Sequence, residues 1–117
     1  MSDSATEPLR VVLCTVPDAD TARAVARALV EEHLAACVNV IDRLTSIYRW
    51  KGSIEEDAEL LLVIKTRAAL FDALAVRIDE LHPYSVPEVV GLDVAACHAP
   101  YARWLVASTL PEGEPTS

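Results

Sequence analysis

The stretch His82–Glu88 constrains the fold of this chain more than any other, because it contains two prolines within a few residues. Proline disfavours the α region in the residue before it, so a helix that runs up to Leu81 must end at His82. Val86 is likewise pushed toward an extended backbone. The stretch therefore predicts the end of a helix and the start of a strand, with a histidine, a tyrosine and a carboxylate fixed along the path.

The length and hydropathy of the chain favour one domain with an unusually apolar surface. A chain of 117 residues forms a single hydrophobic core. Apolar residues make up 52% of it, but charges interrupt every apolar run before the roughly 18 residues that a membrane span needs. Residues 1–8 are polar and lack the features of a signal peptide, so we expect disordered tails at 1–8 and 111–117 of a cytoplasmic protein. The excess of apolar residues predicts an oligomer.

The charge and the cysteines narrow the range of partners. Ten basic and eighteen acidic residues give a net charge of −8, which disfavours binding to nucleic acid or to an anionic membrane. The three cysteines are an odd count without a C-x-x-C pair, so the sequence predicts neither a disulfide framework nor a tetrahedral zinc site. Reduced thiols in the cytoplasm are the simplest interpretation.

Two apolar segments without alternation, Leu9–Val16 and Glu59–Lys65, are typical of central strands. Between them, Asp18 is the expected N-cap of a first amphipathic helix. The other expected elements are a strand over 35–50 with a bulge at 42–43, a turn at 51–53, a helix over 70–81 capped by Thr66, a strand over 89–96 and a helix over 101–108.

This order, βαββαβ with an extra C-terminal helix, predicts an α+β ferredoxin-like sandwich over residues 9–110. The first and third strands are central in that fold, as the two non-alternating segments require. The helices cover only one face of such a sheet, and the long hairpin over 35–65 extends beyond them. Both features favour a symmetric oligomer in which subunits cover the open faces.

Several motifs together resemble the CutA divalent-cation tolerance proteins. They are Val12–Thr15, Ala35–Asn39, Ser46–Gly52, Glu59 with Lys65–Thr66, His82–Tyr84 with Pro87–Glu88, and Tyr101 with Trp104. The resemblance implies a tight homotrimer, an architecture similar to the PII signalling proteins, and a role in tolerance to copper and other divalent cations. It also implies that copper, where it binds, is held by Cys14 and His82.

The chain departs from the family pattern in two places. Leu81 stands where some members have a second histidine, and Cys97 replaces a glycine that is often found before the last helix. The missing donor predicts weak copper binding and no obligatory cofactor, and Cys97 with His98 forms a second soft pair. Cys14 also fits a role as a small buried hydrophobe, and His82 a role as a helix-end cap.

A further set of residues fits either a polar pocket at a subunit junction or an interface of ion pairs and packed aromatic rings. These residues are Tyr48, Trp50, Glu59, Lys65, Tyr84 and Glu88. Two functions remain open: a metal-tolerance protein with weak copper binding, or a PII-like sensor or adaptor that binds a small molecule in clefts between subunits. No catalytic constellation stands out, so we do not expect an enzyme.

Overall fold

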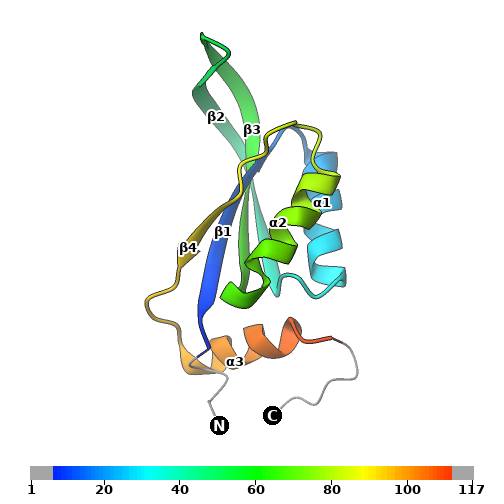
Figure 1. The fold of residues 1–117 in the computed structure, drawn as a ribbon, viewed down its shortest axis with the longest axis vertical. Helices are drawn as coiled ribbons and strands as arrows, with labels where there is room; N and C mark the ends of the chain where they lie inside the picture. Colours follow the sequence, from blue (N-terminus) through cyan, green and yellow to red (C-terminus); the bar gives the residue numbers. More distant parts are fainter. Residues whose placement is uncertain (1–6, 112–117) are drawn as a thin grey trace.

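The computed structural model describes residues 7–111 and has the predicted α+β ferredoxin-like order (Figure 1). Its strands are β1 (Leu9–Val16), β2 (Cys37–Trp50), β3 (Ser53–Arg67) and β4 (Val90–Asp93). Its helices are α1 (Ala19–Glu31), α2 (Phe71–Leu81) and α3 (Ala99–Ser108), with a 3₁₀ turn at Ala68–Leu70. The antiparallel sheet has the order β2-β3-β1-β4, which confirms that the two non-alternating segments are central.

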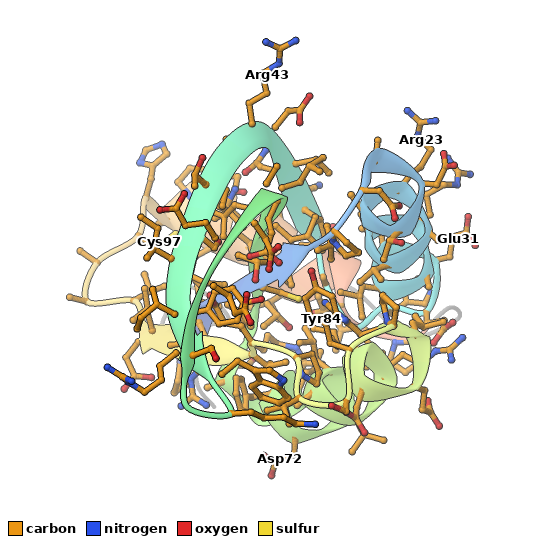
Figure 2. All side chains as sticks on the ribbon, turned by 90° about the horizontal axis from the view of Figure 1, so that it is seen from above. Arg23, Glu31, Arg43, Asp72, Tyr84 and Cys97 are labelled. Atoms are coloured by element: carbon orange, nitrogen blue, oxygen red, sulfur yellow. The ribbon has the colours of Figure 1, made fainter. Side chains whose placement is uncertain are left out.

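The main core lies between the sheet and the pair of helices α1 and α2, which cover the same face of the sheet (Figure 1). Alternate residues of β1 and of the half of β3 that pairs with it point into this core, as the period of a strand requires. The fully buried side chains include Val12, Val16, Leu62 and Ile64 from the strands and Val25, Leu29, Leu74 and Ile78 from the helices. Viewed along the long axis, α1 turns Arg23 and Glu31 outward, away from this core (Figure 2).

Of the three helix ends that the sequence predicted, at Asp18, Leu81 and Thr66, the first two are confirmed. Asp18 caps α1 by accepting a hydrogen bond from the Thr21 amide at 2.7 Å, and α2 ends at Leu81, with His82 already extended. The prediction that Thr66 caps the second helix is wrong. Thr66 lies inside β3 and donates its hydroxyl to the carbonyl oxygen of Leu34 at 2.6 Å, because the ladder between β1 and β3 continues to Arg67.

The hairpin of β2 and β3 extends beyond the helices and gives the molecule a longest dimension of 52 Å (Figure 1). Its turn places Lys51 and Gly52 at φ 49° and 82°, the left-handed pair that a two-residue hairpin turn requires. The predicted bulge is confirmed, since the register shifts between Ile41 and Leu44. Arg43, at φ 63°, lies in this bulge.

The chain differs from prediction at several boundaries. β4 is shorter than the expected strand over 89–96, because it pairs with β1 only along Val90–Asp93. The last helix begins earlier, at Ala99. In the expected N-terminal tail, Glu7 bonds to Arg67 at 3.0 Å and the Pro8 carbonyl accepts a hydrogen bond at 3.0 Å, so these two residues are anchored. The rest of both expected tails, 1–6 and 112–117, lies outside the described residues.

The face of the sheet opposite α1 and α2 is apolar, and in residues 7–111 only its end is covered. There α3 packs against Leu9 through Ala102, Leu105 and Val106. The remaining apolar side chains of this face are partly or largely exposed: Val11, Leu13, Leu61 and Val63, with Ile41 at 48%, Val90 at 46% and Leu92 at 49%. An apolar surface of this extent is typical of a protein interface.

Candidate functional site

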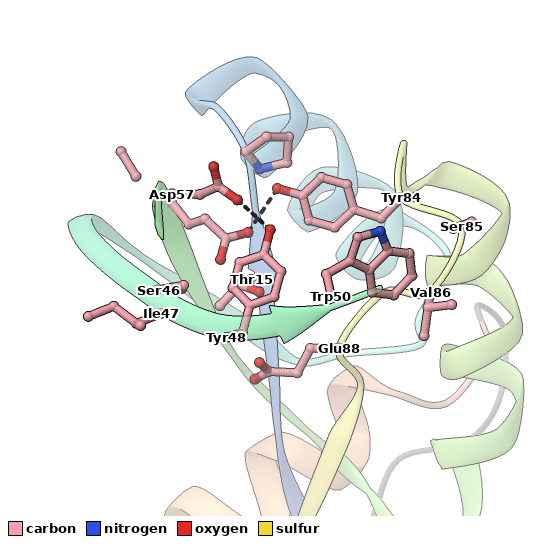
Figure 3. Close-up of a pocket in the computed structure, with 13 residues that line it drawn as sticks. Thr15, Ser46, Ile47, Tyr48, Trp50, Asp57, Tyr84, Ser85, Val86 and Glu88 are labelled. Atoms are coloured by element: carbon pink, nitrogen blue, oxygen red, sulfur yellow. Dashed lines mark hydrogen bonds between the residues drawn. The ribbon is translucent and has the colours of Figure 1, made fainter. Parts of the chain in front are cut away.

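A cavity of about 800 Å³ lies where the hairpin, the end of β1 and the loop after α2 come together (Figure 3). Five of the six residues predicted for a pocket line it: Tyr48, Trp50, Glu59, Tyr84 and Glu88. They come from three separate parts of the chain, and the prolines that flank the loop after α2 hold Tyr84 and Glu88 beside the hairpin. The structure therefore brings these five side chains together around one cavity.

Two tyrosines of the cavity are tied to carboxylates. Tyr48 donates its hydroxyl to Asp57, and Tyr84 donates its hydroxyl to Glu59 at 2.9 Å (Figure 3). The hydrogen bond to Asp57 raises the pKa of Tyr48 to about 12. Burial and the bond to Glu59 also raise the pKa of Tyr84. Both hydroxyls therefore remain protonated near neutral pH and hold the two carboxylates in place.

Lys65 is the sixth predicted pocket residue, and it does not line the cavity. It lies on β3 beyond Glu59, at a distance of roughly 20 Å for a strand that rises about 3.3 Å per residue. Its cross-strand neighbours are Val11 and Cys37. Lys65 therefore lies on the uncovered apolar face of the sheet, far from the cavity.

Sequence reasoning missed Asp57 and Thr15, which both line the cavity. A signal for Asp57 was present. The two-residue turn pairs Tyr48 with Glu55, and a residue two positions farther along β3 lies on the same face, within reach of a tyrosine. Thr15 gave no such signal, because its approach to the cavity depends on how the loop after α2 packs over β1.

Cys14 and His82, the two copper ligands that the resemblance implies, do lie close to each other. The His82 Nε2 atom is 2.7 Å from the Thr15 carbonyl oxygen, and the Cys14 Sγ atom is 3.7 Å from the same oxygen. His82 also accepts a hydrogen bond from the Tyr84 amide on Nδ1, at 3.1 Å. Since Nδ1 accepts, Nε2 must carry the proton that bonds Thr15, so both ring nitrogens are engaged with the backbone.

The chemistry of this pair does not fit a ready copper site. Cys14 is fully buried, and burial, together with the carboxylates of Glu88 and Glu59, raises its pKa to about 12. A metal needs the thiolate and a free ring nitrogen, and the arrangement supplies neither near neutral pH. Within residues 7–111, no group of three or more histidine, cysteine or acidic side chains is placed to hold a metal ion.

The second soft pair lies elsewhere. Cys97 is exposed in the loop before α3 and donates to the carbonyl oxygen of its neighbour His98 at 3.6 Å (Figure 2). Cys37 is half-buried on β2.

In the described part of the chain, no helix is both long and apolar enough to cross a membrane.

Comparison with known proteins gives a consistent result. The family model of the CutA1 divalent ion tolerance protein matches residues 10–108. The chain is 54% identical over 99 residues to the divalent-cation tolerance protein CutA of Thermus thermophilus, covering 85% of this chain and 96% of that protein. It is 50% identical over 91 residues to the human protein CutA, covering 78% of this chain but only 51% of the human protein.

Solved structures agree with the fold. The crystal structure of CutA1 from Oryza sativa superimposes with a TM-score of 0.87 at 42% identity, covering 91% of this chain and 97% of that one. The family match, the close relative and the shared fold lead to one conclusion: this chain belongs to the CutA divalent-cation tolerance family.

Proposed function

We propose that this protein is a non-catalytic homotrimer that contributes to tolerance of divalent cations, copper among them, in the cytoplasm. The observation that carries the assembly is the uncovered apolar face of the sheet, in which Ile41, Val90 and Leu92 are each about half exposed in the single chain. Packing this face against the same face of other copies would remove it from water. Family membership supports the role in cation tolerance.

The absence of catalysis is a proposal that rests on the cavity and on His82. The tyrosine hydroxyls already bond the carboxylates of Asp57 and Glu59, and the backbone occupies both nitrogens of His82. A general acid or base must exchange its proton with a substrate. The two tyrosine hydroxyls, the two carboxylates and the His82 ring are instead bonded to other groups of the protein.

Copper binding at Cys14 and His82 should be weak, and no cofactor should be needed for folding. Binding there would require deprotonation of a thiol whose pKa is about 12 and the loss of a hydrogen bond of 2.7 Å to the Thr15 carbonyl. Both costs subtract from the affinity, and the cost of deprotonating the thiol grows as the pH falls.

The cavity supports the second function, a PII-like sensor or adaptor that binds a small molecule between subunits. A volume of about 800 Å³ is within the range of small-molecule sites, and aromatic rings and fixed polar groups line it. The hairpin that forms one wall extends beyond its own helices, so a neighbouring subunit would complete the cleft.

A direct test of the main proposal measures copper tolerance in cells. Cells that lack their own CutA relative should grow at higher copper concentrations when they express this chain. Leu92→Asp is the matched control, because it should prevent assembly while leaving Cys14 and His82 unchanged. No gain in tolerance from the parent chain would contradict the proposed role.

A second test locates any copper site. Copper is titrated by calorimetry into the parent protein and into its His82→Ala, Cys14→Ala and Cys97→Ala variants. We expect weak binding that the first two changes reduce. Loss of binding only in the Cys97 variant would place the metal at the loop before α3 instead.

A further inference from the structure

All the charged side chains that line the cavity are acidic. Asp57, Glu59 and Glu88 contribute carboxylates, and no lysine, arginine or histidine among residues 7–111 lines it. The two bonds from tyrosine hydroxyls fix Asp57 and Glu59 in position. Glu59 is itself buried, so a cation that reached it would meet a carboxylate with little competing water. The electrostatics of the cavity therefore favour a positively charged ligand and disfavour an anion.

The other walls of the cavity are aromatic and aliphatic. The rings of Tyr48, Trp50 and Tyr84 surround the same space, and Ile47 and Val86 lie at its edge (Figure 3). Aromatic faces attract ammonium groups through the ring quadrupole. One of these rings already holds a cation of the chain itself, because the Lys51 Nζ atom lies 5.8 Å from the centre of the Trp50 ring.

We propose that this cavity binds a protonated aliphatic amine, with its ammonium groups bonded to Glu59 and Glu88 and its carbon chain packed against the aromatic rings. This inference rests on the second proposed function, the cleft that binds a small molecule. A bare divalent ion fits less well, because it gains nothing from the aromatic and aliphatic walls of the cavity. An amine uses both the carboxylates and the rings.

Calorimetric titration with three probes of similar length tests the charge that the cavity selects. The probes are 1,4-diaminobutane, the uncharged butane-1,4-diol and the dianion succinate, with magnesium chloride as an inorganic dication, all at one ionic strength. We expect only the diamine to bind, with a dissociation constant below about 1 mM for a ligand of this size. Equal binding of magnesium would indicate general attraction to a protein of charge −8 and would overturn the proposal.

Substitutions then locate the binding. Glu59→Gln keeps an acceptor for Tyr84, and Glu88→Gln changes an exposed side chain, so the second variant serves if the first fails to fold. The matched control is Glu56→Gln, the same loss of charge on β3 outside the cavity. We expect each cavity variant to weaken diamine binding about tenfold or more, since hydrogen bonds to charged groups are the strong ones, and the control to bind like the parent. Equal weakening in all three variants would overturn the site.

The outcomes separate this inference from the functions on which it rests. Binding of succinate or of the diol in place of the diamine would leave a small-molecule cleft but refute the amine. Failure of all three probes refutes the amine while sedimentation still reports the trimer. Tight diamine binding to a chain that sediments as a monomer would support the amine and refute the assembly.

Discussion

Trp50 offers the sharpest test of the proposed trimer. It lies next to the turn of the hairpin and is 42% exposed in the single chain, although it is one of the largest apolar side chains. The hairpin that carries Trp50 extends beyond α1 and α2 (Figure 1), and part of this side chain remains open to water in the single chain. A neighbouring subunit is the partner that would cover it.

The exposed area sets the size of the effect of Trp50→Ala. A tryptophan that buries up to about 250 Å² in full has roughly 100 Å² left to bury at 42% exposure. At about 25 cal/mol per Å², covering that area contributes roughly 2.5 kcal/mol per copy. Three copies in a trimer contribute on the order of 7 kcal/mol, or about five decades in the association constant.

Sedimentation equilibrium over a dilution series measures this loss. The parent protein should have three times the mass of the 12.7 kDa chain at every concentration, and the variant should dissociate at concentrations where the parent does not. Val76→Ala is the control, because Val76 is 61% exposed on α2 and faces neither the hairpin nor the open sheet face. A Trp50 variant that assembles and melts like the parent would refute the role of the hairpin in the interface.

Two further predictions concern the single subunit. Gly91→Ala should lower the free energy of unfolding in urea by about 1–3 kcal/mol, because the added Cβ would lie 2.7 Å from the Cδ atom of Arg10 and 2.8 Å from the Phe71 ring. An unchanged midpoint of urea unfolding would mean that both side chains move aside freely. Burial raises the pKa of Cys14 from 9.0 to about 12, so its contribution to stability is complete below pH 9 and is lost as the pH rises through 12. Cys14→Ala should therefore flatten the decline in stability above pH 9, whereas the exposed Cys97→Ala control should keep the parent's slope.

The sequence predicted the topology because the strongest local signals also determine it. The prolines after Leu81 end a helix regardless of its surroundings, and the left-handed turn at Lys51 and Gly52 fixes which residues of β2 and β3 pair. The two long apolar runs are indeed the central strands β1 and β3, although the single chain covers only one face of them along most of their length. These features depend on a few neighbouring residues, so a single sequence reveals them.

Predictions that depend on distant contacts were less successful. Thr66 resembles a helix cap, but β1 extends the ladder far enough to keep it inside β3. Lys65 was grouped with the pocket because strand ends, a hairpin tip and a proline-locked loop tend to converge at subunit junctions, but within one chain β3 places it far from the cavity. Asp57 joins the cavity only through a diagonal contact across the hairpin. Such relations follow from register and packing, which the sequence does not state directly.

The position of His82 changes how a copper experiment must be interpreted. Its ring links the Thr15 carbonyl, at 2.7 Å, to the Tyr84 amide, at 3.1 Å, and its centre lies 4.6 Å from that of the Tyr84 ring. Removing the imidazole leaves a carbonyl and an amide unpaired in a largely buried place, at a cost of about 1–3 kcal/mol each. His82→Ala should therefore lose stability even when no metal is present.

This loss separates a structural histidine from a ligand. Urea unfolding of the parent and of His82→Ala, both in excess chelator, should differ by about 2–6 kcal/mol if the two backbone bonds contribute to stability. His98→Ala is the control, because no side-chain bond caps α3 at His98. If His82→Ala unfolds like the parent in chelator but loses copper binding, His82 acts as a ligand and the backbone bonds contribute little. If stability falls without metal, a weaker copper signal in the variant reports a disturbed loop, and the assignment of His82 as a ligand would need a spectroscopic signature of metal-bound imidazole.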